Sequence, residues 1–210
     1  MVTAEVGGPS DGWQRRRARI SLQIERAALQ LFATQPSDEV TVEQIAQAAG
    51  ISKRTFFRYF ATRDEVLAVM PNRQVDALCA RVAARPAKET VLEAFIAAVQ
   101  QGEGDDAARD DIVLLWATAI RRGAGLPQLD GRNGPQLKAL TEVIAKREGL
   151  EVSDVRVQTW ATAIAAVLGA SFASWLETDG AGPSPKTIEE WFVALGEIGQ
   201  GRRRPRRATS

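Results

Sequence analysis

The amino-acid sequence predicts an all-α protein with a small N-terminal head of three helices and a larger C-terminal helical body. Three observations support this fold class. Apolar residues recur at spacings of three and four, two short segments of the head carry their own helix-capping residues, and the head and body differ in charge. We expect the head at residues 13–61 and the body at 62–199, with disordered tails at 1–12 and 200–210.

Charge is distributed unevenly along the chain, although its net value is only +1. Residues 13–63 hold nine Lys/Arg and four Asp/Glu, a net of +5, whereas residues 64–200 hold thirteen against twenty, a net of −7. A basic head on an acidic body is typical of a DNA-binding module joined to a part with another role. The arginine-rich tail after residue 200 is expected either to add phosphate affinity or only to aid solubility.

The first helix of the head is expected over residues 15–34, where Ile20, Ile24, Leu31 and Phe32 share a face. Four arginines stand on or before its first turn. They could contact DNA phosphates or the minor groove, or simply be a solvated run of charge. These arginines are Arg15, Arg16, Arg17 and Arg19.

Two capped helices with a short connector follow at residues 41–60. Thr41 and Gln44 have the spacing of a capping box, and Gly50 suits the left-handed conformation at which a helix stops. Ser52 can cap the next helix, and Phe56 and Phe60 repeat at i, i+4 on its inner face. This pattern predicts a helix-turn-helix.

The outer face of the second helix mixes cations, hydroxyls and aromatic rings, which suits contact with duplex DNA. A solvated basic helix in an ordinary bundle is the alternative. The candidate DNA-binding residues are Arg17, Thr41, Ser52, Lys53, Arg54, Thr55, Phe57, Arg58, Tyr59 and Arg63.

Residues 17–69 resemble the TetR family of bacterial transcriptional regulators. The resemblance rests on the run TVEQIAQAAGIS, on RTFFRYF and on the charged helix start TRDE. It implies repression of transcription by a homodimer that binds a palindromic operator and is released by a small molecule. Arg63 matches a family lysine that contacts phosphate. Phe57 and Arg58 replace tyrosines that the family often carries, so the operator sequence does not follow from the resemblance.

The body is expected to contain helices at residues 62–85, 86–100, 107–122, 136–148, 153–178 and 187–198. Pro71 should kink or split the first of them. The helix at 153–178 is apolar on almost all sides and must be buried, either in a monomer core or by a second copy. The resemblance implies that the last two helices form the dimer interface. The candidate interface residues are Trp160, Ala165, Gly169, Trp175, Trp191 and Phe192, and each of the three tryptophans could equally be core.

An effector site is expected among the middle helices, with an apolar lining and an arginine at its rim. The segment LPQLDGR and the later IAKREG loosely resemble a subgroup with acyl-coenzyme-A-like ligands, so a small apolar or acyl-type effector is expected. Ordinary core packing is the alternative for each candidate residue. The candidates are Met70, Phe95, Val99, Trp116, Ile120 and Arg121.

Composition argues against other classes of protein. The chain has no histidine and one cysteine, Cys79, so no catalytic residue, metal site or cofactor is expected. No signal peptide and no apolar run of membrane-spanning length are expected, which favours a cytoplasmic protein without a membrane partner. A DNA-binding regulator without an effector and, less consistent with the composition, an all-α enzyme are the alternatives.

Overall fold

The computed structural model describes residues 9–102, 111–125, 134–177 and 185–199, and every regular element among them is helical. The chain divides into two compact units. We call residues 1–69 with 114–127 the head unit, and residues 70–113 with 128–210 the body unit. The all-α fold class is therefore confirmed. The predicted boundary is different, because residues 62–69 and 114–127 group with the head.

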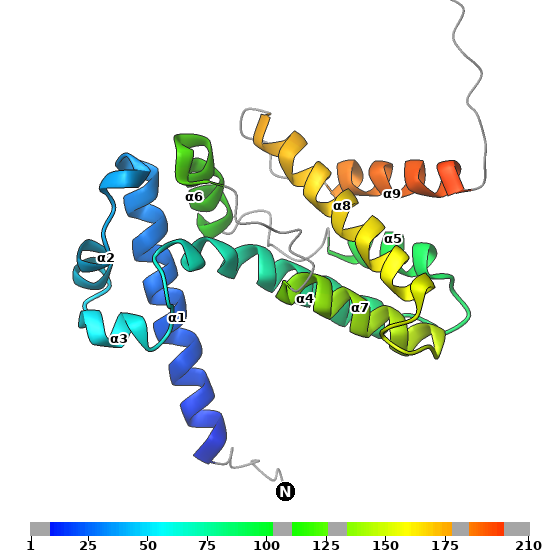
Figure 1. Cartoon of the computed structure of the whole chain (residues 1–210), viewed down its shortest axis with the longest axis horizontal. Coiled ribbons are helices and arrows are strands. Elements are labelled where there is room, and N and C mark those ends of the chain that lie inside the picture. The colour runs from blue at the N-terminus through cyan, green and yellow to red at the C-terminus, as the bar shows by residue number, and fades with distance from the viewer. Residues whose placement is uncertain (1–8, 103–110, 126–133, 178–184, 200–210) are drawn as a thin grey trace, which may run out of the picture. The chain divides into compact units, whose positions relative to one another are not determined.

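The head unit is built on one long helix, α1 (Pro9–Thr34), with two short helices, α2 (Val42–Ala48) and α3 (Lys53–Phe57), to one side of it (Figure 1). Helix α1 begins at Pro9, upstream of the expected start at residue 15. Residues 9–12, expected in a disordered tail, are therefore helical. The rest of that tail and the tail at 200–210 lie outside the described residues.

The local capping predictions hold in detail. The Thr41 hydroxyl accepts the backbone N–H of Gln44 at 3.2 Å, and the Gln44 side chain accepts the backbone N–H of Thr41 at 2.8 Å. The Ser52 hydroxyl accepts the backbone N–H of Thr55 at 3.1 Å. Gly50 has φ +63°, the left-handed conformation that favours glycine. The capping bonds fix where α2 and α3 begin, and Gly50 lies just after the end of α2.

A second segment joins the head unit through a buried tryptophan. Trp116 lies on α6 (Asp111–Ala119), is fully buried, and donates its indole N–H to the carbonyl of Leu67 at 2.7 Å. The π-helical turn η4 (Ile120–Ala124) follows and contacts α1 and the 3-10 turn η1 (Ser37–Glu39). These contacts explain why residues 114–127 group with the head.

Pro71 splits the predicted helix at residues 62–85 into two elements. A 3-10 turn, η2 (Asp64–Ala68), precedes α4 (Val69–Ala83), and Pro71 is the third residue of α4. Proline is tolerated there because backbone N–H groups in the first helical turn have no partner within the helix.

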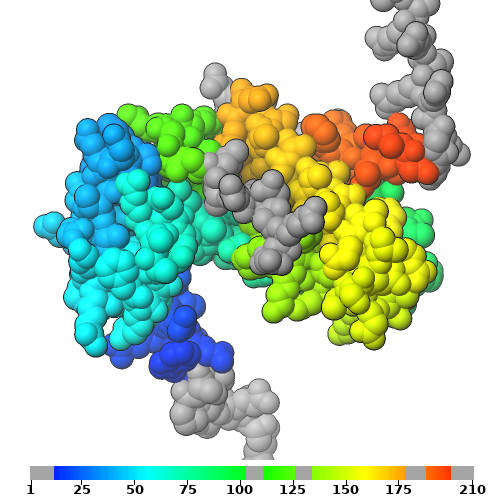
Figure 2. Space-filling view, viewed as in Figure 1, coloured from blue at the N-terminus to red at the C-terminus, as the bar shows by residue number. Residues whose placement is uncertain are grey.

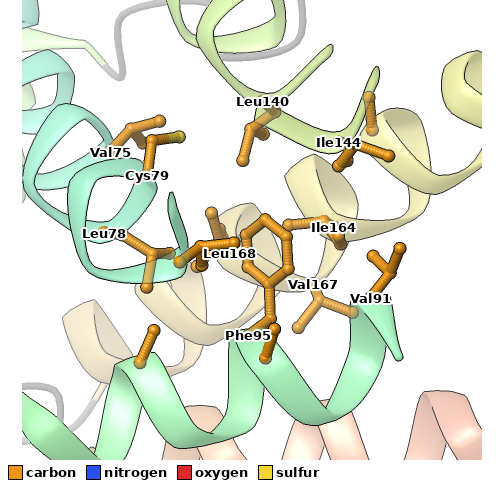
Figure 3. Packing of buried hydrophobic residues seen from close by; sticks show 14 of the residues in the cluster. Val75, Leu78, Cys79, Val91, Phe95, Leu140, Ile144, Ile164, Val167 and Leu168 are labelled. Carbon is orange, nitrogen blue, oxygen red and sulfur yellow. The ribbon is translucent and has the colours of Figure 1, made fainter. Parts of the chain in front are cut away.

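The body unit packs five helices around one apolar cluster: α4, α5 (Val91–Gln101), α7 (Pro135–Glu148), α8 (Val155–Glu177) and α9 (Pro185–Gly199). Phe95 projects from α5 into the space between α4, α7 and α8, beside Leu78 and Leu168 (Figure 3). Cys79 belongs to this cluster, and burial raises the pKa of its thiol to about 12. It is therefore a packing residue with almost no thiolate at neutral pH.

Helix α8 corrects one sequence expectation. It has 23 residues and is apolar enough to cross a membrane by length and composition, although no such segment was expected. Core helices of water-soluble proteins meet the same criteria, and 33% of its most apolar window is buried within the chain. Among the residues that the structure describes, Val155, Thr159, Thr162, Ala166 and Ala173 of α8 stay exposed.

Candidate DNA-binding surface

Helix α3 is held by aromatic residues on its inner side. Phe56 and Phe60 are buried with ring centroids 5.6 Å apart, and Phe57 meets the Phe56 ring edge-on at 5.6 Å. Because the helix is anchored on one side only, Lys53, Arg54 and Phe57 are exposed. Phe57 is 48% exposed, which is unusual for a phenylalanine. Its ring offers an apolar contact on the same short helix as the cations Lys53 and Arg54.

The capping hydroxyls lie at the exposed starts of α2 and α3. Thr41 and Ser52 each accept one backbone N–H, and Ser52 also shares a hydrogen bond of 2.9 Å with the Thr55 hydroxyl. Thr41 and Ser52 are both exposed and Thr55 is half-buried. The structure thus brings three of the candidate hydroxyls to two neighbouring helix N-termini, where the macrodipole attracts a phosphate.

Lys53 is held by an acidic residue that sequence reasoning did not consider. Its ammonium forms an ion pair with the Glu43 carboxylate of α2 and lies 6.0 Å from the centre of the Phe57 ring. The hydrogen bond from Lys53 lowers the pKa of Glu43 below its usual value. Glu43 therefore stays ionised near neutral pH and keeps Lys53 paired in the protein without DNA.

We expect Glu43→Gln to strengthen DNA binding about two- to fivefold, because an exposed ion pair is weak and its loss frees Lys53 for phosphate. Fluorescence anisotropy with a labelled duplex measures the effect. Glu39→Gln removes the same charge from an exposed position of the head unit outside α2 and α3, and is the control. An equal gain from both variants would assign the effect to net charge instead of to the Glu43–Lys53 pair.

Aromatic rings and guanidinium groups alternate beyond the end of α3. Arg58 lies 5.5 Å from the centre of the Tyr59 ring, and Arg17 of α1 lies 5.6 Å from the same ring. Three of the predicted residues, far apart in sequence, therefore meet at one point of the head unit. Sequence patterns could not have shown that Arg17 belongs with the end of α3.

Arg63, which was expected to contact phosphate, has several partners within the head unit. It is half-buried, and its guanidinium donates to the backbone carbonyls of Ser37 and Val40 and lies 5.9 Å from the centre of the Phe32 ring. An ion pair of 3.1 Å with Asp64 completes its contacts. The two bonds from its Nη1 tie the η1 turn to the head unit, and a contact of Arg63 with phosphate stays a prediction.

The candidate effector residues are divided between the two units. Met70, Phe95 and Val99 are buried in the body unit, whereas Trp116, Ile120 and Arg121 belong to the head unit. A small cavity of about 20 Å³ lies elsewhere in the body unit, between α4, α7 and α8. It is lined by Pro71, Val75, Gln136, Leu140, Ala165, Leu168, Gly169 and Phe172. The LPQLDGR segment lies outside the described residues.

The candidate interface residues also separate. Trp191 is 40% exposed, but Phe192 is fully buried against Phe95 with ring centroids 6.0 Å apart, and Trp175 is buried as well. Phe192 and Trp175 are therefore core residues of one protomer, which corrects their expected place at an interface. Trp160 is half-buried, and Ala165 and Gly169 line the small cavity.

An exposed apolar stripe on the last two helices was largely missed by sequence reasoning. On α8 it runs at spacings of three, four and seven through Val155, Thr159, Thr162, Ala166 and Ala173. On α9 it includes Trp191, Ala194 and Ile198. Helices α8 and α9 pack on each other, and their surfaces are in view side by side in Figure 2. The heptad-like spacing of the exposed residues was the signal that could have identified it.

The all-helical fold and the exposed basic side of α3 define a helix-turn-helix DNA-binding protein. Residues 24–70 match the family model described as bacterial regulatory proteins, tetR family, and residues 132–198 match the one described as MftR C-terminal domain. The chain belongs to the TetR family of DNA-binding transcriptional regulators.

Named relatives agree with this assignment. The chain is 36% identical to the HTH-type transcriptional regulator TcmR of Streptomyces glaucescens, over 67% of this chain and 66% of that protein. It is 28% identical to MftR of Mycobacterium tuberculosis, over 89% of this chain and 93% of that one. The structure of the TetR-family repressor FadR of Thermus thermophilus, in complex with lauroyl-CoA, superposes with a TM-score of 0.53 at 19% identity, over 90% of this chain and 98% of that chain. That likeness concerns the fold alone.

Proposed function

We propose that the chain is a transcriptional repressor of the cytoplasm that binds a palindromic operator as a homodimer and leaves it when a small apolar molecule binds. The observation that carries the proposal is α3, a capped helix anchored by Phe56 whose exposed side bears Lys53, Arg54 and Phe57. Cations for phosphate and guanine beside an apolar ring are the groups that a major-groove helix needs.

The apolar stripe on α8 and α9 supports the homodimer. Small residues such as Ala166 and Ala173 let two copies of α8 approach closely, and Trp191 and Ile198 supply apolar area at the side. A two-fold pairing of α8 and α9 buries this stripe against its own copy and presents two heads to two half-sites.

The effector site of the proposal lies in the body unit. The cavity between α4, α7 and α8 has mainly apolar walls and one buried amide, Gln136, which favours an apolar ligand with a polar group. FadR, with the same fold, is described in complex with lauroyl-CoA, and an acyl ligand is the first class to test.

The size of that cavity favours a second candidate, a regulator without a small-molecule effector. About 20 Å³ is the space of a single water molecule, so a ligand must open the site. A titration of the protein–DNA complex with lauroyl-CoA, against coenzyme A without the acyl chain, separates the two candidates. Release by the acylated form alone supports an acyl effector, whereas no release by either favours the second candidate.

Selection of bound sequences from a random DNA pool tests DNA recognition itself. Purified wild-type protein is expected to enrich a palindromic motif, and Lys53→Ala is expected to bind the enriched duplex about tenfold more weakly with its helical content unchanged, since one charge-assisted contact is lost. Wild-type protein that is folded but enriches no motif would contradict sequence-specific regulation. A motif without two-fold symmetry would contradict the homodimer.

A further inference from the structure

An open groove of about 310 Å³ lies between the start of α1 and the end of α3. It is lined by Trp13, Arg16, Arg17, Ile20, Arg58 and Tyr59. Positions 13, 16, 17 and 20 share one face of α1 by helical spacing. The groove therefore combines one face of α1 with Arg58 and Tyr59, the two residues that follow α3. All six lining residues belong to the head unit.

Cations and rings alternate along the groove. The Arg17 guanidinium lies 5.5 Å from the centre of the Trp13 ring and 5.6 Å from the centre of the Tyr59 ring. The Arg58 guanidinium also lies 5.5 Å from the centre of the Tyr59 ring. Stacking holds a guanidinium by its faces and leaves the N–H groups at its edge available to an acceptor. Figure 1 shows the start of α1 extending past α3, which places this wall of the groove beyond the end of the candidate recognition helix.

Among the described residues that line the groove, three are arginines and none is acidic. Among the residues that the structure describes, no carboxylate pairs with Arg16, Arg17 or Arg58, in contrast to Lys53 and Arg63. Trp13 is 62% exposed although it is a tryptophan, and Ile20 is half-buried beside it. Three uncompensated guanidinium groups beside exposed aromatic surface suit a ligand with both an anionic and an apolar part.

We propose that this groove binds one phosphodiester unit of the DNA backbone, outside the bases that α3 contacts. The phosphate lies on the guanidinium edges of Arg16, Arg17 and Arg58, because their forked N–H groups match its oxygens. The adjoining deoxyribose packs on Trp13 and Tyr59. The proposal rests on the proposed DNA-binding function, adds Trp13 to its contact residues, assigns Arg16 but not Arg15 to a phosphate, and makes the start of α1 a clamp on the flanking backbone.

The test uses a labelled duplex of random sequence, so it does not depend on finding an operator. Binding is measured over a range of salt concentrations for wild-type protein, Trp13→Ala, Arg16→Ala and Arg15→Ala. Arg15 is the matched control, because it is exposed and adjacent to Arg16 but lies on another side of α1, outside the groove. Circular dichroism confirms that each variant is folded.

We expect Arg16→Ala to weaken binding about tenfold, as one charge-assisted contact implies, and to reduce the slope of log affinity against log salt by about 0.9. Trp13→Ala should weaken binding without changing that slope, since it removes packing and no charge. Arg15→Ala should change the affinity and the salt slope much less than Arg16→Ala does. Equal effects of Arg15→Ala and Arg16→Ala would overturn the proposal in favour of a diffuse electrostatic field.

A second arm asks whether the phosphate ester comes from DNA or from a free nucleotide. A deoxynucleoside monophosphate is titrated while the fluorescence of Trp13 is followed as the difference between wild type and Trp13→Phe. No saturable change with the nucleotide, and a change on adding duplex, supports the DNA backbone. The DNA assignment would be overturned if the nucleotide saturated the fluorescence change of Trp13 and Arg16→Ala left the slope of log DNA affinity against log salt unchanged. Loss of DNA binding by Lys53→Ala tests the proposed function separately, because Lys53 lies outside the groove.

Discussion

Replacing Trp116 with alanine is expected to lower the free energy of unfolding by about 3–5 kcal/mol, the usual cost of deleting a large buried aromatic side chain. Trp116 is fully buried, and its indole N–H bonds the Leu67 carbonyl at 2.7 Å. The substitution leaves a cavity and an unpaired buried carbonyl at the point where α6 joins the head unit. Chemical denaturation followed by circular dichroism measures the loss.

Two further variants separate packing from hydrogen bonding at this site. Trp116→Phe keeps most of the apolar contact but removes the donor, and should cost about 1–3 kcal/mol, the penalty of a buried carbonyl left without a partner. Trp13→Ala deletes a tryptophan that is 62% exposed, so its unfolding midpoint should match the wild type. A midpoint for Trp116→Ala equal to that of Trp13→Ala would contradict the role of Trp116 in joining residues 114–127 to the head.

Ala166→Glu is expected to raise the dissociation constant of the homodimer at least 100-fold and to abolish tight operator binding. Ala166 is exposed in the protomer at the middle of the α8 stripe, so a glutamate there costs the single chain little. In a two-fold interface the same position is occupied twice, and each copy would bury an unpaired charge, a cost of about 3–5 kcal/mol. Sedimentation velocity and operator titration measure the two effects.

Ala80→Glu is the matched control, because Ala80 is also an exposed helical alanine but lies on α4 and is not part of the stripe on α8 and α9. It should leave the oligomeric state and the affinity for DNA unchanged. A dimer of unchanged stability in Ala166→Glu would place the interface on another surface of the body unit.

The features that were predictable from the sequence depend on neighbours along the chain. Thr41 and Gln44 cap one helix, Ser52 caps the next through Thr55, and Gly50 has the expected positive φ. Each of these bonds spans three residues, so the residue types and their spacing contain the necessary information. The same reasoning identified the exposed side of α3 with Lys53 and Arg54.

The errors concern contacts between distant residues or choices between two sides of a helix. Phe192 and Trp175 were expected at an interface, but both are buried within the body unit. Trp191 and Phe192 are neighbours in sequence and both apolar, yet one is exposed and the other fully buried. Because successive residues on a helix point about 100° apart, periodicity marks apolar sides without saying which one faces the core.

The sequence by itself determined the helical class, the helix-turn-helix with its caps, the basic head and the acidic body, since these depend on residue type and short-range hydrogen bonding. Only the tertiary structure decided that Trp116 anchors a later segment to the head, that Arg17 meets Tyr59 and Arg58, and that α8 and α9 keep an apolar stripe exposed. Those facts depend on which surfaces meet when the chain folds, because hydrogen bonds and packing contacts between residues far apart in sequence form only in the tertiary structure.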